Sequence, residues 1–175
     1  MAGVLIGGVG YRWMGDASFG LAVCDALAAE AWPEDVDVVD FGYGALYAAL
    51  DIGDRRPRRL VLVAAVQRGR PPGTLICTRH APQPRSDEEV QEWVRDAGGG
   101  IIELDHLLII ADRFGTLPAE TYLVELEPTH SLTGDGLSDV AARRVEEART
   151  IARALATKAG LLPAEISELV GERTA

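Results

Sequence analysis

The sequence predicts an α/β protein with three layers, an α/β/α sandwich in which helices cover both faces of a mostly parallel sheet. Short apolar runs alternate along the chain with longer segments whose apolar residues recur every three or four positions. The run RLVLVAAV (59–66) is apolar after its first residue, which is typical of a parallel strand that is covered on both faces. With 175 residues and no evident linker or repeat, the chain suits one domain, 1–175.

Five apolar runs have the length and the flanking turns expected of strands. The first, GVLIGG, leads into a glycine-rich turn, and the fourth follows a turn at Pro72 and Gly73. The predicted strands are 3–8, 36–41, 59–66, 73–79 and 120–127.

The helices are predicted from apolar spacing and from signals at their ends. Asp16 stands where the first helix needs its N-cap, and Ser86 and Glu89 have capping-box spacing at the third. Gly115 is placed to end the fourth, and the fifth is long and amphipathic. The predicted helices are 17–32, 44–52, 86–98, 104–115 and 137–160, with a short addition over 162–172.

Composition excludes several classes of protein. The net charge of −10 argues against nucleic-acid binding, which needs a basic surface. No apolar run reaches the roughly 20 residues of a membrane span, and the first residues lack the features of a signal peptide. We therefore expect a cytoplasmic protein without a membrane or nucleic-acid partner. The basic run RRPRR (55–59) is interpreted as a solvated loop, with a docking patch for an acidic partner as the alternative.

Cys24 and Cys77 fall within predicted elements, so we expect both to be buried and unreactive rather than paired or catalytic.

A binding site is expected at the carboxyl ends of the strands, which places it near residues 8–16, 40–44 and 64–68. The glycine-rich turn GGVGYRWMGDASFG (7–20) is not a dinucleotide fingerprint, because Trp13 replaces the third glycine of G-x-G-x-x-G. No Gly-Lys-Ser/Thr follows either, which excludes a P-loop. Asp40 is placed to hold a ribose or to form a turn, so nucleotide binding stays open as an alternative.

Other common sites leave little signal. The sequence has no G-x-S-x-G elbow and no clustered histidines and cysteines of a zinc site. His80 and His130 flank predicted loops and are interpreted as surface residues. His106 lies before LLII, and its residues alone favour a packed or capping role over a ligand role.

Four motifs nevertheless follow one another in an informative order. They are GVGYRWMGDASFG (8–20), DFGYG (40–44), LVLVAAVQRGRPPGT (60–74) and GLS (136–138). Together they resemble the hydrogenase maturation endopeptidases, which trim a C-terminal peptide from the large subunit of nickel-iron hydrogenases after nickel insertion. The family opens approximately with G-x-G-N-x-L-x-x-D-[DE]-x-x-G. The chain keeps Gly8, Gly10, Asp16 and Gly20 of this pattern at matching spacing.

The resemblance implies a twisted five-stranded sheet between helices, of the phosphorylase/hydrolase-like kind. It also implies that three groups contact the substrate's nickel: an acid in the first loop, an aspartate ending the third strand, and a histidine that aligns with His106. The metal belongs to the substrate, so no permanently bound cofactor is implied. By this resemblance Asp16 and His106 are candidate catalytic residues, with His106 also the candidate contact to nickel.

The same resemblance makes Gly10, Asp40 and Gly42 candidate substrate-binding residues. The implied partner is a hydrogenase large-subunit precursor or an assembly factor.

The chain departs from the family at the nickel-contacting positions. Ala17 follows Asp16 where the family has an acid, and the strand-end aspartate position falls at Ala64, or at Ala65 with a different gap. Alanine has no atom that binds nickel, and a single imidazole from His106 is a poor metal site. Other possible donors are Asp16, Asp40, Asp105 and Asp112.

Three hypotheses follow. The chain is a divergent maturation endopeptidase with a rearranged site, or a non-catalytic relative that binds a hydrogenase subunit or an assembly factor. The third is an unrelated ligand- or nucleotide-binding α/β domain. Tyr11 and Trp13, where the family has asparagine and small or aliphatic residues, would favour a protein-binding surface if they are exposed.

Overall fold

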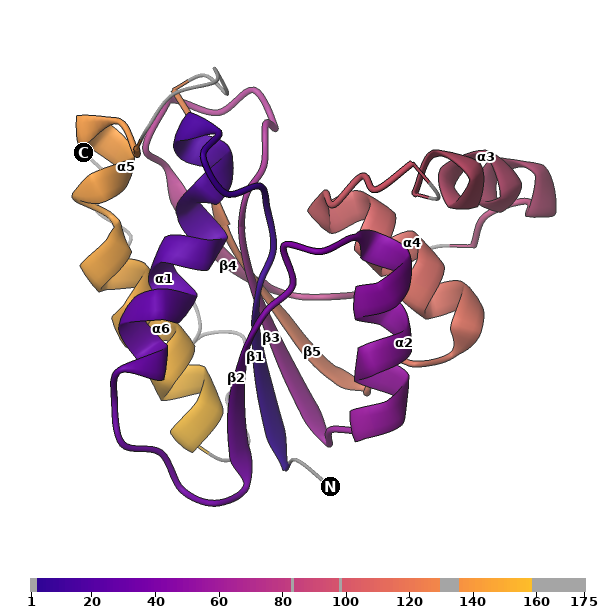
Figure 1. Ribbon diagram of the computed structural model, residues 1–175, viewed down its shortest axis with the longest axis horizontal. Helices are drawn as coiled ribbons and strands as arrows, with labels where there is room; N and C mark the ends of the chain where they lie inside the picture. Colours follow the sequence, from indigo (N-terminus) through magenta and orange to yellow (C-terminus); the bar gives the residue numbers. More distant parts are fainter. Residues whose placement is uncertain (1–2, 83, 98, 130–135, 159–175) are drawn as a thin grey trace.

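Five strands form one sheet in the order β2-β1-β3-β5-β4 (Figure 1). Neighbouring strands are parallel except for β4, which runs antiparallel to β5. The computed structural model describes residues 3–82, 84–97, 99–129 and 136–158. The strands are β1 (Val4–Gly8), β2 (Val36–Asp40), β3 (Arg59–Ala65), β4 (Leu75–Arg79) and β5 (Glu120–Leu126). The mostly parallel five-stranded sheet is therefore confirmed.

Helices cover both faces of this sheet. Helices α1 and α6 lie on one face and α2 and α4 on the other, while α3 packs on α4 away from the sheet (Figure 1). The three-layer α/β/α sandwich is thus confirmed. The helices are α1 (Phe19–Ala28), α2 (Ala45–Arg55), α3 (Asp87–Ala97), α4 (Leu104–Phe114), α5 (Asp139–Ala142) and α6 (Val145–Thr157), with a 3-10 turn η1 (Gly15–Ser18) before α1.

The central strand β3 shows why its sequence is apolar without interruption. Val61 and Val63 belong to the core beneath α1 and α6, whereas Leu60 and Leu62 belong to the core beneath α2 and α4. Successive side chains of a strand point to opposite faces. A strand with helices above and below it therefore needs apolar residues at every position.

Helix α1 approaches the sheet closely at Gly20. A Cβ atom there would lie 2.1 Å from the carbonyl oxygen of Val63 and 2.6 Å from that of Val9. These two residues are themselves hydrogen-bonded, since the Val9 N–H donates to the Val63 oxygen at 2.9 Å. Glycine at this position consequently sets the spacing between α1 and the strand ends beside it.

Two predicted helices differ from the structure. The segment predicted as helix 17–32 begins as η1 and ends at Ala28, where the Trp32 indole donates to the Leu27 carbonyl and meets one of the free carbonyls at the helix end. The segment predicted as 137–160 is divided into α5 and α6. At the division the Arg144 side chain donates to the Gly73 carbonyl of another loop at 2.9 Å.

The end signals of two helices are confirmed. Ser86 and Glu89 exchange the two capping-box hydrogen bonds, at 2.9 and 3.2 Å, and Gly115 ends α4 with a φ of 65°. His130 and the helix predicted over 162–172 lie outside the described residues. Among the helices that the structure describes, none has the length and apolar character needed to span a bilayer.

Candidate functional site

A cavity of about 340 Å³ opens at the carboxyl ends of β1 and β3. The chain leaves these two neighbouring strands toward different parts of the fold, which is where open α/β sheets bind their ligands. Three segments supply most of the wall: the loop after β1 (9–17), the end of β3 (64–67) and the start of α4 (102–105). The predicted location of the site, from residues 8–16 and 64–68, matches this cavity, whereas 40–44 does not line it.

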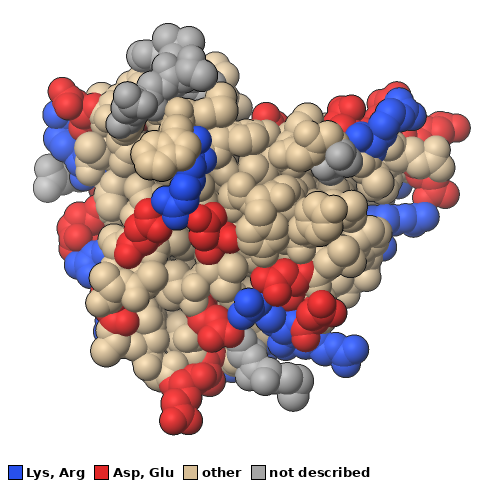
Figure 2. All heavy atoms as spheres, viewed as in Figure 1, with Lys and Arg blue, Asp and Glu red and all other residues tan. Residues whose placement is uncertain are grey.

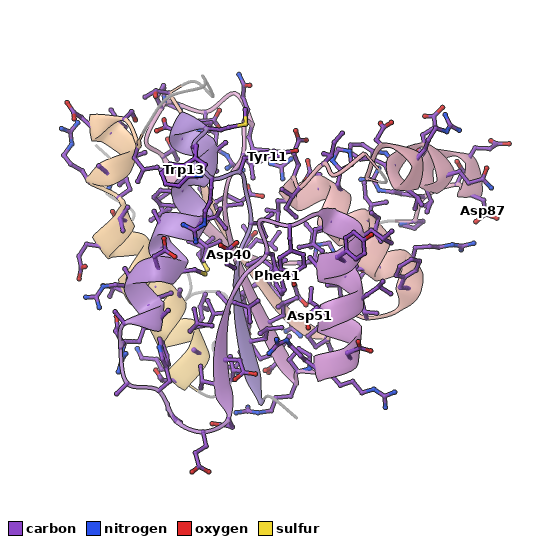
Figure 3. The ribbon with its side chains drawn as sticks, viewed as in Figure 1. Tyr11, Trp13, Asp40, Phe41, Asp51 and Asp87 are labelled. Carbon is purple, nitrogen blue, oxygen red and sulfur yellow. The ribbon has the colours of Figure 1, made fainter. Side chains whose placement is uncertain are left out.

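The loop after β1 is closed by short contacts around Gly10. This residue has a φ of 150°, and a Cβ on it would lie 2.0 Å from the Ala17 carbonyl oxygen, so the turn requires glycine. The same carbonyl accepts a hydrogen bond from the Tyr11 N–H at 3.1 Å. The Tyr11 hydroxyl in turn accepts from the Ile102 N–H at 2.9 Å (Figure 3 labels Tyr11), which joins this loop to the segment before α4. Gly10 therefore lines the cavity, and the backbone turn by itself requires glycine at this position.

Asp16 does not face the cavity. Its buried carboxylate accepts hydrogen bonds from the N–H and hydroxyl of Thr129, at 2.9 and 2.7 Å, and from the N–H and hydroxyl of Ser138, at 2.8 and 3.0 Å. Burial opposes ionisation, but these hydrogen bonds outweigh it and lower the pKa of Asp16. The N-cap prediction for Asp16 is wrong, because neither η1 nor α1 has a side-chain cap. The carboxylate instead joins the first loop to the start of α5.

Asp40 and Gly42 also lie away from the cavity wall. Asp40 accepts from the Arg12 guanidinium at 2.6 Å and from the Gly42 N–H at 2.6 Å (Figure 3 labels Asp40). Arg12 also binds Asp25 through two hydrogen bonds, of 2.8 and 2.9 Å. These hydrogen bonds to Asp25 and Asp40 raise the pKa of Arg12. Asp40 is thus engaged by an arginine and a turn, and the turn-forming interpretation describes its contacts.

The two altered family positions meet inside the cavity. Ala17 from the first loop and Ala64 from β3 both line it, as does Ala65. The wall at these positions therefore presents methyl groups and no metal-binding atom. Among the residues that the structure describes, no three His, Cys, Asp or Glu side chains come together as a metal site.

His106 lies in the first turn of α4, directly after Asp105, and does not line the cavity. Its side chain is 8% exposed and meets the ring of Trp93 edge to face, with the ring centroids 4.3 Å apart. Its Nδ1 atom is buried and has no hydrogen-bond partner within the described part of the chain. The Glu103 carboxylate lies 3.5 Å from this atom, and Glu103 itself lines the cavity. The pair Glu103–His106 therefore brings an imidazole and a carboxylate together beside this wall.

The two other predicted donors are already paired. Asp105 lines the cavity, but Arg68 donates to both of its oxygens, at 2.7 and 2.8 Å. Asp112 lies farther along α4, within 3.0 Å of the His80 Nε2 atom. His80 is half-buried by this contact, so its interpretation as an ordinary surface residue is wrong.

The loop after β3 is held by two acids, Glu125 in β5 and Glu127 directly after it. Arg68 and Arg70 both bind the buried Glu125, and Glu127 accepts from the N–H groups of Arg68 and Gly69. Burial opposes the ionisation of Glu127, but these backbone donors prevail and lower its pKa. Sequence reasoning missed Glu103 as a member of the site, and it included Arg68 only as part of the segment 64–68. The signal for Glu103 was its position alone, directly before α4.

The aromatic residues of the first loop have different surroundings. Trp13 is 75% exposed and has a φ of 66°, an uncommon conformation for a bulky residue, whereas Tyr11 is half-buried (Figure 3). Acidic and basic side chains lie side by side over much of this face, with uncharged areas between them (Figure 2). Trp13 thus meets the condition set for a protein-binding surface, and Tyr11 meets it only in part.

Both cysteines are buried and unpaired, and burial raises the pKa of each thiol to about 12. The predicted burial of both cysteines is confirmed, and their lack of reactivity stays a prediction.

No protein-family model matches the chain, and no curated protein sequence matches it significantly. Solved structures do match. The chain is similar to the hydrogenase 2 maturation peptidase of a Thaumarchaeota archaeon, with 28% identity and a TM-score of 0.62 over 89% of this chain and 99% of the other.

Two further structures extend the comparison. The hydrogenase maturating endopeptidase HybD of E. coli is 23% identical with a TM-score of 0.63, over 83% of this chain and 86% of the other. The [NiFe] hydrogenase maturation protease HycI of Thermococcus kodakarensis is 19% identical with a TM-score of 0.59, over 88% and 92%. The chain thus has the fold of the solved hydrogenase maturation peptidases and is similar in sequence to the archaeal one.

Proposed function

We propose that this protein is a maturation peptidase that removes a C-terminal peptide from the large-subunit precursor of a nickel-iron hydrogenase after nickel insertion. The similarity to solved maturation peptidases supports the activity, and the cavity at the ends of β1 and β3 gives the precursor a binding place. We also propose that the protein acts in the cytoplasm.

The observation that carries the proposal is the unpartnered Nδ1 atom of His106, 3.5 Å from the Glu103 carboxylate. A buried imidazole nitrogen without a partner is costly, so its retention favours a ligand in the working complex. Glu103 is 62% exposed and borders the cavity, which allows its side chain to turn toward a bound precursor. We assign the contact with the substrate's nickel to this pair.

Two donors are too few for a resident metal, which needs three or four ligands from the protein. They are sufficient for a metal that arrives with ligands of its own, as the nickel of the precursor does. The methyl groups of Ala17 and Ala64 remove two contacts, so we expect this protein to distinguish loaded from empty precursor less sharply than a relative with acids there.

The test is a cleavage assay on precursor with and without nickel, read by mass spectrometry of the C-terminus. We expect shortening of the loaded precursor, and a rate at least tenfold lower for Glu103→Gln and His106→Gln. Glu92→Gln, on the exposed face of α3, is the matched control and should cleave at the normal rate. Equal cleavage of loaded and empty precursor would remove nickel contact from the proposal.

A second candidate is a non-catalytic relative that binds a hydrogenase subunit or an assembly factor. It is favoured by the absence of a three-ligand cluster from the described residues and by the exposure of Trp13. Stable binding of the loaded precursor without any shortening, lost in Trp13→Ala, would establish this candidate in place of the peptidase.

A further inference from the structure

A second hollow of about 330 Å³ lies along α4, next to the cavity. The two share Asp105 as a wall residue. The hollow continues into a third, of about 440 Å³, through Arg85, Ile109 and Asp112. We call this the α4 groove and define it by its lining residues from Asp105 to Asp112 on α4, His80 after β4, and Arg85 before α3. In Figure 1 α4 lies between α2 and α3.

The groove has an apolar base and charged ends. Leu108, Ile109 and Leu123 line it while keeping only 6–7% of their surface exposed. At the end near the cavity, Arg68 is bound by Asp105 and Glu125. At the far end, Asp112 holds the His80 ring through Nε2 at 3.0 Å.

Arg85 brings a guanidinium to the far end of the groove, where the nearby Glu89 experiences its charge. Both acids of the groove are taken, Asp105 by Arg68 and Asp112 by His80. Arg85 lines the groove, is exposed, and forms no ion pair with any residue in the described ranges. A guanidinium without an acid partner, beside an imidazole and an apolar base, fits a carboxylate attached to an apolar group.

The length of the groove indicates a peptide. Asp105 and Asp112 are seven positions apart on α4, which corresponds to about 10 Å at the helical rise. An extended chain covers this distance with about three residues.

We propose that the α4 groove binds the C-terminal end of a peptide, with its last apolar side chain on Leu108 and Ile109 and its carboxylate on Arg85. The occupant is the C-terminal tail of a partner protein. This interaction is separate from peptide removal and does not depend on the proposed function.

The test uses the full-length protein and a labelled alanine hexapeptide that ends in leucine, as the free acid and as the C-terminal amide. Binding is measured by fluorescence anisotropy. We expect the acid to bind at least tenfold more tightly, which corresponds to about 1.4 kcal/mol. Arg85→Gln should abolish this preference. Arg95→Gln, an exposed arginine of α3, is the control and should keep it.

Equal affinity for acid and amide, or a preference that survives Arg85→Gln, would overturn the proposal. Competition by hexanoate tests whether the groove binds any small apolar carboxylate, since hexanoate has the same charge on an apolar chain without peptide bonds. Hexanoate that competes as well as the unlabelled peptide would overturn the peptide assignment. Precursor cleavage is scored separately, so either proposal can fail while the other stands.

Discussion

Removing the Asp16 carboxylate should destabilise the protein more than any other single charge removal at the first loop. In Asp16→Ala, Thr129 and Ser138 each lose two hydrogen bonds to a buried anion. A hydrogen bond to a charged group contributes about 1.5–3 kcal/mol, but such values do not add fully within one network. Both donor residues are half-buried, so water replaces part of the loss. We therefore expect a decrease of about 2–4 kcal/mol in the free energy of unfolding.

The assay is urea unfolding of wild type and Asp16→Ala between pH 8 and pH 3, with Asp25→Ala as the control. Asp25 is an exposed carboxylate paired with Arg12, so its removal should cost at most about 1 kcal/mol. For a protein of this size, the Asp16 loss corresponds to a Tm lower by roughly 4–16 °C.

The pH dependence follows from the lowered pKa of Asp16. A depressed folded-state pKa means that the contribution is complete above the unfolded pKa, whose ordinary value is 3.8, and declines as the pH falls through the folded value. The difference between wild type and variant should thus stay constant from pH 8 to about pH 5 and shrink in stronger acid. If the free energies of unfolding of wild type and Asp16→Ala differ by less than 0.5 kcal/mol at pH 7, roughly the scatter of surface substitutions, the Asp16 carboxylate does not stabilise the fold as we argue. A difference that grows as the pH falls would refute this stabilisation as well.

Gly20→Ala should lower the free energy of unfolding by about 3 kcal/mol or more, because the new Cβ would meet two backbone carbonyls that cannot move separately. Gly136→Ala is the control: open space surrounds this position, so the free energy of unfolding should change little. Calorimetric melting of both variants checks this. Cys24 and Cys77 have thiol pKa values raised to about 12, so they should resist iodoacetamide at pH 8 in the folded protein and react in 6 M urea. Mass spectrometry counts the alkylated cysteines. Alkylation of the folded protein at the rate of free cysteine would contradict their burial.

The elements of the sheet could be predicted because their cause is local. An uninterrupted apolar run such as that of β3 indicates a strand that is buried on both faces. The location of the site is predicted because ligands bind at the carboxyl ends of parallel strands. The segments 8–16 and 64–68 were therefore expected near one another, and both contribute to the cavity wall.

The directions of the site's side chains could not be predicted in this way. Asp16 meets Thr129 and Ser138 across 113 and 122 positions, and no short pattern encodes such a distance. The His106 ring packs against Trp93. Trp93 belongs to α3, a helix that packs on α4 rather than on the sheet. Arg68 and Asp105 likewise meet only because the loop after β3 and the start of α4 share one wall.

The middle position of β3 has a consequence for how the molecule opens. This strand is bordered by β1 and β5 and covered by cores on both faces, whereas β4 has a neighbour on one side only. Amide protons of β3 can therefore exchange with solvent only when both cores separate, and those of β4 when one edge detaches. In deuterium exchange, β3 should report the free energy of global unfolding. β4, which leads into the α4 groove at His80, should exchange through smaller openings that leave the rest of the sheet intact.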